Sequence, residues 1–194
     1  MKKVYEYSHL GGAEILQVQF PHLAAETDAC IAEVRAKRTK ISKEKDKKGR
    51  MLYDPKAMNR DFKTAFADRG WAEIKDRYII EIPSYPVKIR GSFKQIDFCK
   101  ERVLVEVQLG KYFSMFYDLA KFQYFFNKSQ AKLGVEVVPA NALKRKMSSG
   151  VSYGEQLVYD IERLERHFPA VPIKIILIDV DDAPPLQPAV VHEN

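Results

Sequence analysis

The spacing of apolar positions changes from a helical to an extended period along the chain. Between residues 22 and 36, apolar side chains recur every three to four positions, which predicts an amphipathic helix. A second helix is predicted to begin at Asp54-Pro55, with the aspartate as N-cap and the proline in the first turn, and to end at Gly70. Its buried side is expected to consist of Met58, Phe62, Ala65 and Phe66.

Extended segments occupy the middle and the end of the chain. Residues 78–82 and 87–93 have the composition of strands, and residues 95–108 follow as a strand, a tight polar turn and a second strand. Residues 135–138 form a short buried strand that a proline closes. Residues 171–180 are nearly all apolar and β-branched, which is typical of an interior strand.

Two more helices are predicted between these strands. Residues 112–126 carry eight aromatic side chains spread over more than one helical face. Such a helix must be covered on several sides, either by the core alone or by the core and a dimer interface. Ser152 and Glu155 have capping-box spacing, which predicts a helix that continues to Phe168. Helices and strands in this order predict an α/β fold, with a central mixed β-sheet flanked by helices.

Length and composition favour one domain. The chain has 194 residues, 46% of them hydrophobic, which is enough for one compact unit with a full core. We expect a single domain over residues 1–180. The tail at residues 181–194 is rich in proline and is expected to be disordered.

Cysteine content and hydropathy favour a cytoplasmic protein. Cys30 and Cys99 are too few for a disulfide framework and have no zinc-binding spacing, which fits a reducing compartment. The chain shows no signal-peptide pattern and no run of the ~20 apolar residues that a membrane span needs. We therefore expect a soluble protein that has no membrane partner.

Positive charge is concentrated in one segment. The net charge is +6, but residues 35–50 hold nine basic side chains against two acidic ones. This clustering favours a nucleic acid over a membrane, and the alternative is a solvated, flexible loop. We expect residues 35–53 to form a basic loop that contacts DNA. The side chains expected to contact phosphates are Arg38, Lys40, Lys43 and Lys45.

The predicted hairpin brings two carboxylates together. Apolar side chains at every second position from Val103 to Leu109 share one face of its second strand, so Glu106 and Gln108 project from the other. The turn folds Asp97 back beside Glu106. Two neighbouring carboxylates repel each other unless a cation lies between them, and an oxygen-donor pair with open positions suits Mg²⁺.

Phosphodiester hydrolysis is the reaction that most often needs such a metal site. Asp97 and Glu106 could bind one or two Mg²⁺ ions, although acidic pairs on surface hairpins are also common without any catalytic role. Gln108 occupies a position where nucleases of this geometry often have a lysine. An amide accepts no proton at neutral pH, so Gln108 could only orient the attacking water by hydrogen bonding. Glu14 is a candidate third carboxylate, and the alternative for it is a helix-start residue.

Several ordered motifs point to one family. The hairpin carries Ile96-Asp-Phe, then Val105-Glu-Val-Gln, then Lys111-Tyr. Matching outlying segments are residues 8–16, 38–40, 42–45, 52–55 with Asn59, and 147–150 with Ser152-Tyr153. Up to about Asp179 the chain resembles the BglII and BstYI type II restriction endonucleases, and the outlying segments are closest to the BstYI branch.

This resemblance implies a PD-(D/E)xK nuclease fold and a homodimer that encircles double-stranded DNA in a bacterial or archaeal cytoplasm. It also implies Mg²⁺-dependent double-strand cleavage at a palindrome with a GATC core, without an organic small-molecule cofactor. Carried over by position, Asp97 and Glu106 would bind the metal ion and Gln108 would replace the usual lysine. Ile96 stands where many such nucleases have a proline, a change that the resembled family tolerates.

Base reading is also implied by the resemblance. Lys111, Ser148 and Ser149 match places where the family contacts bases. A lysine that leaves the catalytic strand can reach guanine in the major groove, and a serine can donate or accept. Lys111 and Ser149 favour purine-GATC-pyrimidine over AGATCT as the recognition site.

Three alternatives remain open from the sequence. One is a structure-specific or repair nuclease of the same fold. Another is a DNA-binding protein that has lost catalysis, which the presence of Asp97, Glu106 and Gln108 disfavours. The third is a glycosidase that uses the carboxylate pair as acid and nucleophile, although a basic loop gives a neutral sugar nothing to bind.

Overall fold

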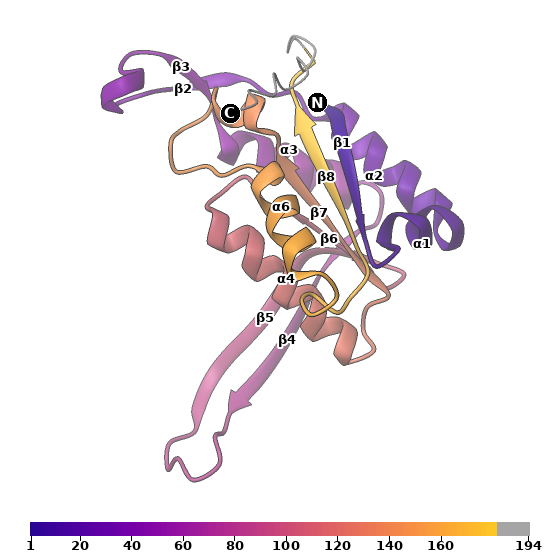
Figure 1. Ribbon diagram of the computed structural model, residues 1–194. Helices are drawn as coiled ribbons and strands as arrows, with labels where there is room; N and C mark the ends of the chain where they lie inside the picture. Colours follow the sequence, from indigo (N-terminus) through magenta and orange to yellow (C-terminus); the bar gives the residue numbers. More distant parts are fainter. Residues whose placement is uncertain (182–194) are drawn as a thin grey trace, which may run out of the picture.

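A six-stranded mixed sheet forms the centre of the molecule (Figure 1). The computed structural model describes residues 1–181, and the tail expected to be disordered lies, apart from Asp181, outside the described residues. In sheet order the strands are β1 (Lys2–His9), β8 (Ile173–Asp179), β7 (Leu133–Pro139), β6 (Val103–Val107), β5 (Ile89–Lys100) and β4 (Ala72–Ile80). Strands β6, β7 and β8 run parallel, whereas the other neighbours in this sheet are antiparallel.

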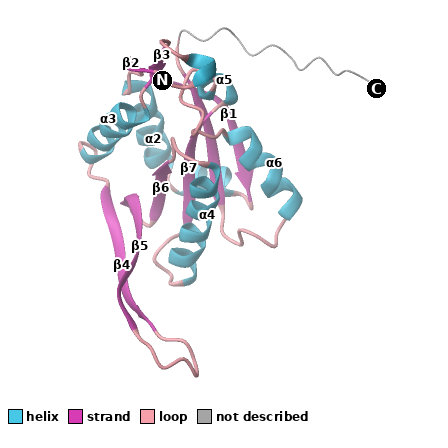
Figure 2. Cartoon of the chain, turned by 90° about the vertical axis from the view of Figure 1, so that its left-hand side faces the viewer, coloured by secondary structure: helices cyan, strands magenta, loops and turns pink. Residues whose placement is uncertain are grey.

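Helices cover both faces of the sheet, as Figure 2 shows. One face carries α1 (Gly12–Gln19), α2 (Pro21–Glu33) and α3 (Pro55–Ala67), and the other carries α4 (Tyr112–Asn127) and α6 (Gly154–Leu164). Each face has its own apolar core: Val105 of β6 packs with the first group of helices, and Leu104 packs with the second. A short helix, α5 (Asn141–Lys144), follows β7. The α/β fold with a central mixed sheet is therefore confirmed.

The interior strands follow their sequence pattern, whereas the edge strand does not. β7 and β8 are buried along their whole length, because helices lie over both faces of the sheet. This burial explains why residues 171–180 are apolar without alternation. β1, which pairs with β8 at the edge, has half-exposed positions in no regular order and was not predicted.

α3 matches its prediction closely. It begins at Pro55, and the Asp54 side chain accepts a hydrogen bond from the Lys56 N–H at 3.0 Å, as an N-cap should. Its buried residues are Met58, Phe62, Ala65 and Phe66, as expected. Gly70, which follows the helix, has a φ of 76°, a backbone conformation that glycine adopts without strain.

α6 departs from the prediction at both ends. It begins at Gly154 and ends at Leu164, and no side chain caps its N-terminus. The Ser152 N–H donates to Gly110 O at 2.8 Å, so Ser152 lies outside the helix. The Glu155 carboxylate accepts from the Asn141 N–H at 2.9 Å instead of folding back on its own helix. Because Ser152 and Glu155 both form hydrogen bonds with residues outside the helix, the predicted capping box does not form.

Two antiparallel ribbons extend from the body in Figure 1, and Figure 2 shows the longer of them, β4–β5, from another side. The β4–β5 ribbon is longer than predicted, because β5 runs without a break into the carboxylate hairpin; residues 81–90 at its tip are exposed. The basic segment was predicted as a loop but is largely a second ribbon, in which paired strands satisfy each other's backbone groups. Its elements are β2 (Arg38–Ile41), the 3₁₀ helix η1 (Lys45–Lys47) and β3 (Met51–Tyr53). None of the described helices is long and apolar enough to cross a membrane.

Candidate active site

The β5–β6 hairpin brings Asp97 and Glu106 together, as the spacing predicts. The pairing of β5 with β6 runs from Lys100–Val103 to Phe98–Val105, and one further step in that register places Asp97 opposite Glu106. On the next strand, Glu136 of β7 pairs with Glu106. Side chains that lie opposite each other on paired strands project from the same face. Three carboxylates therefore form a row across β5, β6 and β7.

Asp97 lies at an irregularity of β5. The register between β4 and β5 shifts by one residue between the pairs Ala72–Cys99 and Ile74–Ile96. An extra residue of this kind bends a strand and turns a side chain away from its regular position, and such bulges are common beside active sites. Asp97 is exposed, whereas Glu106 is buried. One carboxylate of the Asp97–Glu106 pair therefore lies at the surface and the other lies in the protein interior.

Two cavities meet at Asp97. The first lies on the α3 side and is also lined by Asn59 and Lys63 of α3 and by Glu73. The second lies on the α4 side and is also lined by Tyr117 and Lys121 of α4. A ligand that reaches Asp97 therefore contacts basic and polar side chains from either helix.

Helix α4 holds the hairpin residues from the side. The Lys121 ammonium forms ion pairs with Glu106 and, at 2.7 Å, with Asp118 Oδ1. Gln108 Nε2 donates to Asp118 Oδ2 at 2.8 Å, and the Gln108 backbone N–H donates to Val137 O at 2.9 Å. Asp118 and Lys121 are three residues apart, so both lie on one face of the helix. Side chains of β6 and α4 thus form one connected network.

Burial changes the acidity of this network. Burial, and then the Asp118 carboxylate, raises the pKa of Glu106 to about 8, against the opposing effect of Lys121. Burial also raises the pKa of Asp118, although Lys121 and Gln108 lower it. Burial disfavours the charged form of Lys121, but Glu106 and Asp118 outweigh it and raise the pKa of that ammonium. Lys121 therefore stays charged, whereas Glu106 binds a proton more readily than an ordinary glutamate.

Glu136 completes the row without a partner. Its side chain is fully buried, and neither carboxylate oxygen has a hydrogen-bond partner among the described residues. Burial, followed by the nearby Asp118 and Glu106, raises the pKa of Glu136 well above its ordinary value. A carboxyl group buried in this position therefore holds its proton more tightly than an ordinary glutamate.

Sequence reasoning missed most of this network. Glu136 stood out as an acid inside an apolar strand, but no partner could be assigned to it. Asp118 and Lys121 were not singled out, although an acid and a base three residues apart are unusual in a helix that is otherwise so aromatic. The Asp118–Lys121 spacing was the feature of the sequence that could have indicated a polar site on α4.

The donor set fits a hard divalent cation. Asp97 and Glu106 offer carboxylate oxygens, which Mg²⁺ and similar ions prefer, and the exposed position of Asp97 leaves room for further oxygen ligands. Among the described residues, no group of three or more His, Cys, Asp or Glu side chains is arranged to hold a metal ion. The fit is therefore that of an open site with two protein carboxylates.

Glu14 does not belong to this site. It lies in the first turn of α1, and its exposed carboxylate accepts a hydrogen bond from the Ser8 hydroxyl of β1. Strands β8 and β7 separate β1 from β6, so Glu14 is on the far side of the sheet from Glu106. The helix-start alternative is the correct one for Glu14.

The segments expected to read bases lie next to each other. Lys111 is exposed and immediately precedes α4. The hydrogen bond from the Ser152 N–H to Gly110 O joins the loop that contains Ser148 and Ser149 to the segment that contains Lys111. This backbone contact thus brings together two segments that are far apart in the sequence.

The basic ribbon is attached to the same loop. Lys47 Nζ donates to Met147 O at 2.7 Å, and the Ser149 N–H donates to the Glu44 carboxylate at 3.0 Å. The Arg38 guanidinium lies 4.7 Å from the centre of the Tyr53 ring. The four basic residues singled out in the sequence are all exposed on this ribbon: Arg38, Lys40, Lys43 and Lys45.

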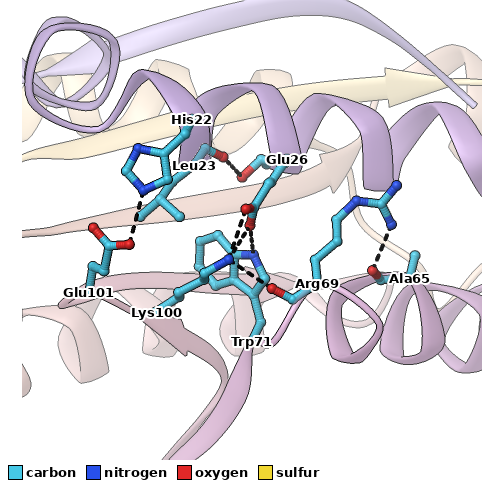
Figure 3. A network of polar contacts seen from close by, with 9 residues as sticks. His22, Leu23, Glu26, Ala65, Arg69, Trp71, Lys100 and Glu101 are labelled. Carbon is cyan, nitrogen blue, oxygen red and sulfur yellow. Dashed lines mark hydrogen bonds and ion pairs between the residues drawn. The ribbon is translucent and has the colours of Figure 1, made fainter.

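A second polar network supports the hairpin from the α2 side (Figure 3). Lys100, at the end of β5, donates to Glu26 at 2.8 Å and to Arg69 O at 2.8 Å. The Trp71 indole N–H also donates to Glu26, at 2.7 Å. In the turn between β5 and β6, Glu101 pairs with His22 at 3.0 Å. These contacts tie the hairpin to α2 and so fix the position of Asp97 and Glu106.

Comparisons with known proteins agree with the fold described above. The family model described as restriction endonuclease BglII/BglIII matches residues 4–178. No curated protein matches the chain. The crystal structure of restriction endonuclease BglII complexed with a DNA 16-mer is similar, with a TM-score of 0.69, 20% sequence identity, and coverage of 91% of this chain and 77% of that chain. The crystal structure of free BglII has a TM-score of 0.63 and 18% identity, and the match covers 91% of this chain and 79% of that chain.

Proposed function

The chain belongs to the BglII/BglIII restriction endonuclease family, and from this membership we propose that it makes Mg²⁺-dependent double-strand cuts at a palindromic DNA site with a GATC core. The observation that carries the proposal is the position of Asp97 opposite Glu106, with Gln108 two residues further along. The activity is assigned to residues 1–180 as one domain, acting in the cytoplasm of a bacterium or archaeon.

Each residue of the hairpin has a proposed role. Asp97 and Glu106 would hold the metal ion through their carboxylate oxygens. When bound, Mg²⁺ lowers the pKa of a water molecule and neutralises charge on the leaving oxygen. Gln108 would orient the attacking water by hydrogen bonding, because its amide cannot take up a proton at neutral pH. Lys121 and Lys63, which line the cavities at Asp97, supply positive charge near the phosphodiester.

Double-stranded DNA is the proposed substrate. One similar solved structure is BglII in complex with a DNA 16-mer. In the present chain, the exposed basic residues of the β2–β3 ribbon suit contacts to phosphates, which position a protein on DNA without reading its sequence. These residues are Arg38, Lys40, Lys43 and Lys45.

The recognition site is proposed from three exposed or half-exposed side chains. Lys111, Ser148 and Ser149 would read bases in the major groove, where lysine suits guanine and serine suits several partners. On the resemblance to the BstYI branch, Lys111 and Ser149 would read purine-GATC-pyrimidine, so we propose this site, with AGATCT as the narrower alternative.

A palindromic site implies a two-fold symmetric protein, so we propose a homodimer. Helix α4 offers an apolar surface for the second copy. Its Phe113 and Tyr117 side chains are 68% and 50% exposed, which is unusual for aromatic residues on a helix that otherwise packs into the core.

Digestion of unmethylated plasmid DNA with the purified protein and Mg²⁺ tests the proposal directly. Sequencing of the fragment ends would show discrete cuts at GATC-centred palindromes and would identify the outer base pair. Cutting at ends that share no sequence would favour a structure-specific or repair nuclease of the same fold. Sequence-specific binding without any cutting, in Mg²⁺ or Mn²⁺, would favour a DNA-binding protein that has lost catalysis.

A further inference from the structure

The catalytic strand lacks the lysine that many nucleases of this geometry have, and α4 brings a lysine to the same place. Gln108 stands two residues after Glu106 on the hairpin. Lys121 reaches Glu106 from outside the hairpin, and only 14% of its side chain is exposed. A buried ammonium is costly unless carboxylates surround it, so Lys121 is held where Glu106 and Asp118 can pair with it.

We propose that Asp118 and Lys121 are positioning residues for DNA cleavage, which rests on the nuclease function proposed above. Lys121 holds the carboxylates of Glu106 and Asp118 in fixed positions. Asp118 in turn fixes the orientation of the Gln108 side-chain amide. The carbonyl oxygen of Gln108 is then the group presented to the reacting water. In this chain, α4 and not the catalytic strand thus supplies the positive charge of the site and the carboxylate that orients Gln108.

The orientation of the Gln108 amide follows from its partner. Asp118 Oδ1 accepts from Lys121 and Oδ2 accepts from Gln108, so both carboxylate oxygens act as acceptors. The Gln108 amide therefore turns its N–H group towards Asp118, with Nε2 as the donor at 2.8 Å. The Gln108 carbonyl oxygen, Oε1, then points away from Asp118 and remains available to accept a hydrogen bond.

Gly110 leaves the space into which this oxygen turns. A Cβ atom at residue 110 would lie 2.6 Å from Gln108 Oε1, which is closer than real contacts allow. Because the obstructed atom is the end of a flexible side chain, a methyl group there would displace the amide and leave the backbone in place. The absence of a side chain at residue 110 thus permits the orientation that Asp118 imposes.

A double-mutant cycle tests whether Asp118 acts through Gln108. The variants are Asp118→Asn, Gln108→Leu and the double variant, and the readout is the single-turnover rate of plasmid cleavage in Mg²⁺. Loss of a partner that orients a ligand or a catalytic group typically costs about 10- to 100-fold. We expect such a loss for Asp118→Asn alone and little further loss when Gln108 is already leucine, because the two residues act as a unit. Equal losses in both backgrounds would show that Asp118 only supports the fold, and would overturn the proposal.

Lys121 is tested by substitution and rescue. Lys121→Met should slow single-turnover cleavage by about 10- to 100-fold, and Lys121→Arg, which keeps the charge, should recover most of the rate. DNA binding in Ca²⁺, which separates binding from cutting, should change by less than about threefold. The matched control is Lys128→Met, which removes the ion pair between Lys128, the C-cap of α4, and Asp76 and should leave the rate unchanged. Wild-type cleavage by Lys121→Met would overturn the proposal.

A structural readout keeps the proposal testable even if a variant unfolds or the protein cuts no DNA. In ¹⁵N-glutamine-labelled protein, the side-chain amide protons of Gln108 should exchange slowly with water, because one of them is donated to Asp118. The Gln108→Leu spectrum identifies the signal. Asp118→Asn and Lys121→Arg, checked for folding by circular dichroism, should perturb this signal, and Lys128→Met should not. An unperturbed signal in Asp118→Asn would overturn the positioning role, whereas a wild-type protein that cuts no DNA would overturn only the proposed function.

Gly110→Ala offers an independent check on the carbonyl oxygen. The added methyl group should displace Gln108 Oε1 and slow cleavage by at least about tenfold, with thermal stability nearly unchanged. Gly110→Ala in the Gln108→Leu background is the control, because that background has no Oε1 atom to displace. An equal fractional loss of rate in both backgrounds would contradict the orientation inferred for Gln108.

Discussion

Glu106 and Glu136 lie directly opposite each other on the parallel strands β6 and β7, and Lys121 forms an ion pair with only one of them, Glu106. Glu136 is fully buried without a hydrogen-bond partner in the described part of the chain. A buried carboxyl group remains neutral if it can, so its proton is held more tightly in the folded than in the unfolded protein. This asymmetry gives the stability of the protein a defined dependence on pH.

Glu136→Gln is expected to stabilise the metal-free protein at neutral pH. The pKa of Glu136 is raised in the folded state, so the folded protein holds a proton that the unfolded chain releases. Between the ordinary value of 4.5 and the raised value, stability therefore falls as pH rises, by up to about 1.4 kcal/mol per pH unit for one proton. Urea unfolding in EDTA should show that the variant's gain in stability is absent near pH 4 and grows as the pH rises above 4.5. Glu162→Gln, at an exposed position on α6, is the control.

Metal binding should depend on pH through Glu106. Burial and Asp118 raise the pKa of this carboxyl group to about 8, so below that pH a bound cation must displace a proton. The affinity for Mn²⁺ in the absence of DNA is expected to rise about tenfold per pH unit up to about pH 8 and then to level off. Calorimetric titration measures both the affinity and the proton release. An affinity independent of pH between 6 and 8 would show that Glu106 is not a ligand.

Asp97→Asn should separate DNA binding from DNA cleavage. The variant keeps the size of the side chain but removes a metal-binding charge, and we expect cleavage in Mg²⁺ to fall more than about 100-fold. Specific binding in Ca²⁺, measured by fluorescence anisotropy, should be largely retained, and Glu106→Gln should behave alike. Glu162→Gln, which alters an exposed carboxylate on α6, is the control and should cut normally. Near wild-type cleavage by Asp97→Asn would place the metal site elsewhere.

Lys111→Ala should relax the sequence preference of the enzyme. Each lost base contact is expected to cost about 1–3 kcal/mol at the cognate site and little at other sites. Binding to cognate and mismatched duplexes at several salt concentrations measures this effect. A uniform loss for all sequences, with a smaller salt dependence, would identify Lys111 as a phosphate contact. Lys132→Ala, another exposed lysine that lies between α4 and β7, serves as the control.

Trp71→Phe tests the support behind the hairpin. Phenylalanine can keep the edge contact with Phe66, at 5.4 Å between ring centres, but it loses the hydrogen bond to Glu26. A hydrogen bond to a charged group contributes about 1.5–3 kcal/mol, and we expect a loss at the lower end because Lys100 still pairs with Glu26. Urea unfolding should be followed by circular dichroism, since Trp71 is the chain's single tryptophan. Tyr159→Phe, which removes a hydroxyl from an exposed ring, should be neutral.

Local chemistry in the sequence determined several elements of this protein. The Asp54-Pro55 start of α3 and its buried stripe depend on residues within a few turns of each other, and the structure confirms them. The same holds for the hairpin, where alternation from Val103 to Val107 and a short turn suffice to place Asp97 opposite Glu106. The sequence also contains several ordered motifs that resemble those of the family, and the family match extends from residue 4 to residue 178.

Only the tertiary structure decided the rest of the site, because it depends on which strands are neighbours and on which helix covers them. The pairing of β6 with β7 brings Glu136 beside Glu106. The packing of α4 on that face brings Lys121 into contact with Glu106, and Asp118 into contact with Gln108. Sheet order likewise removes Glu14 from the site by two strands. Ser152 and Glu155 show the same limit, since distant backbone groups took the hydrogen bonds that local spacing had predicted for a helix cap. A local pattern fixes what a side chain can do, whereas its partner is chosen by contacts between segments far apart in the chain.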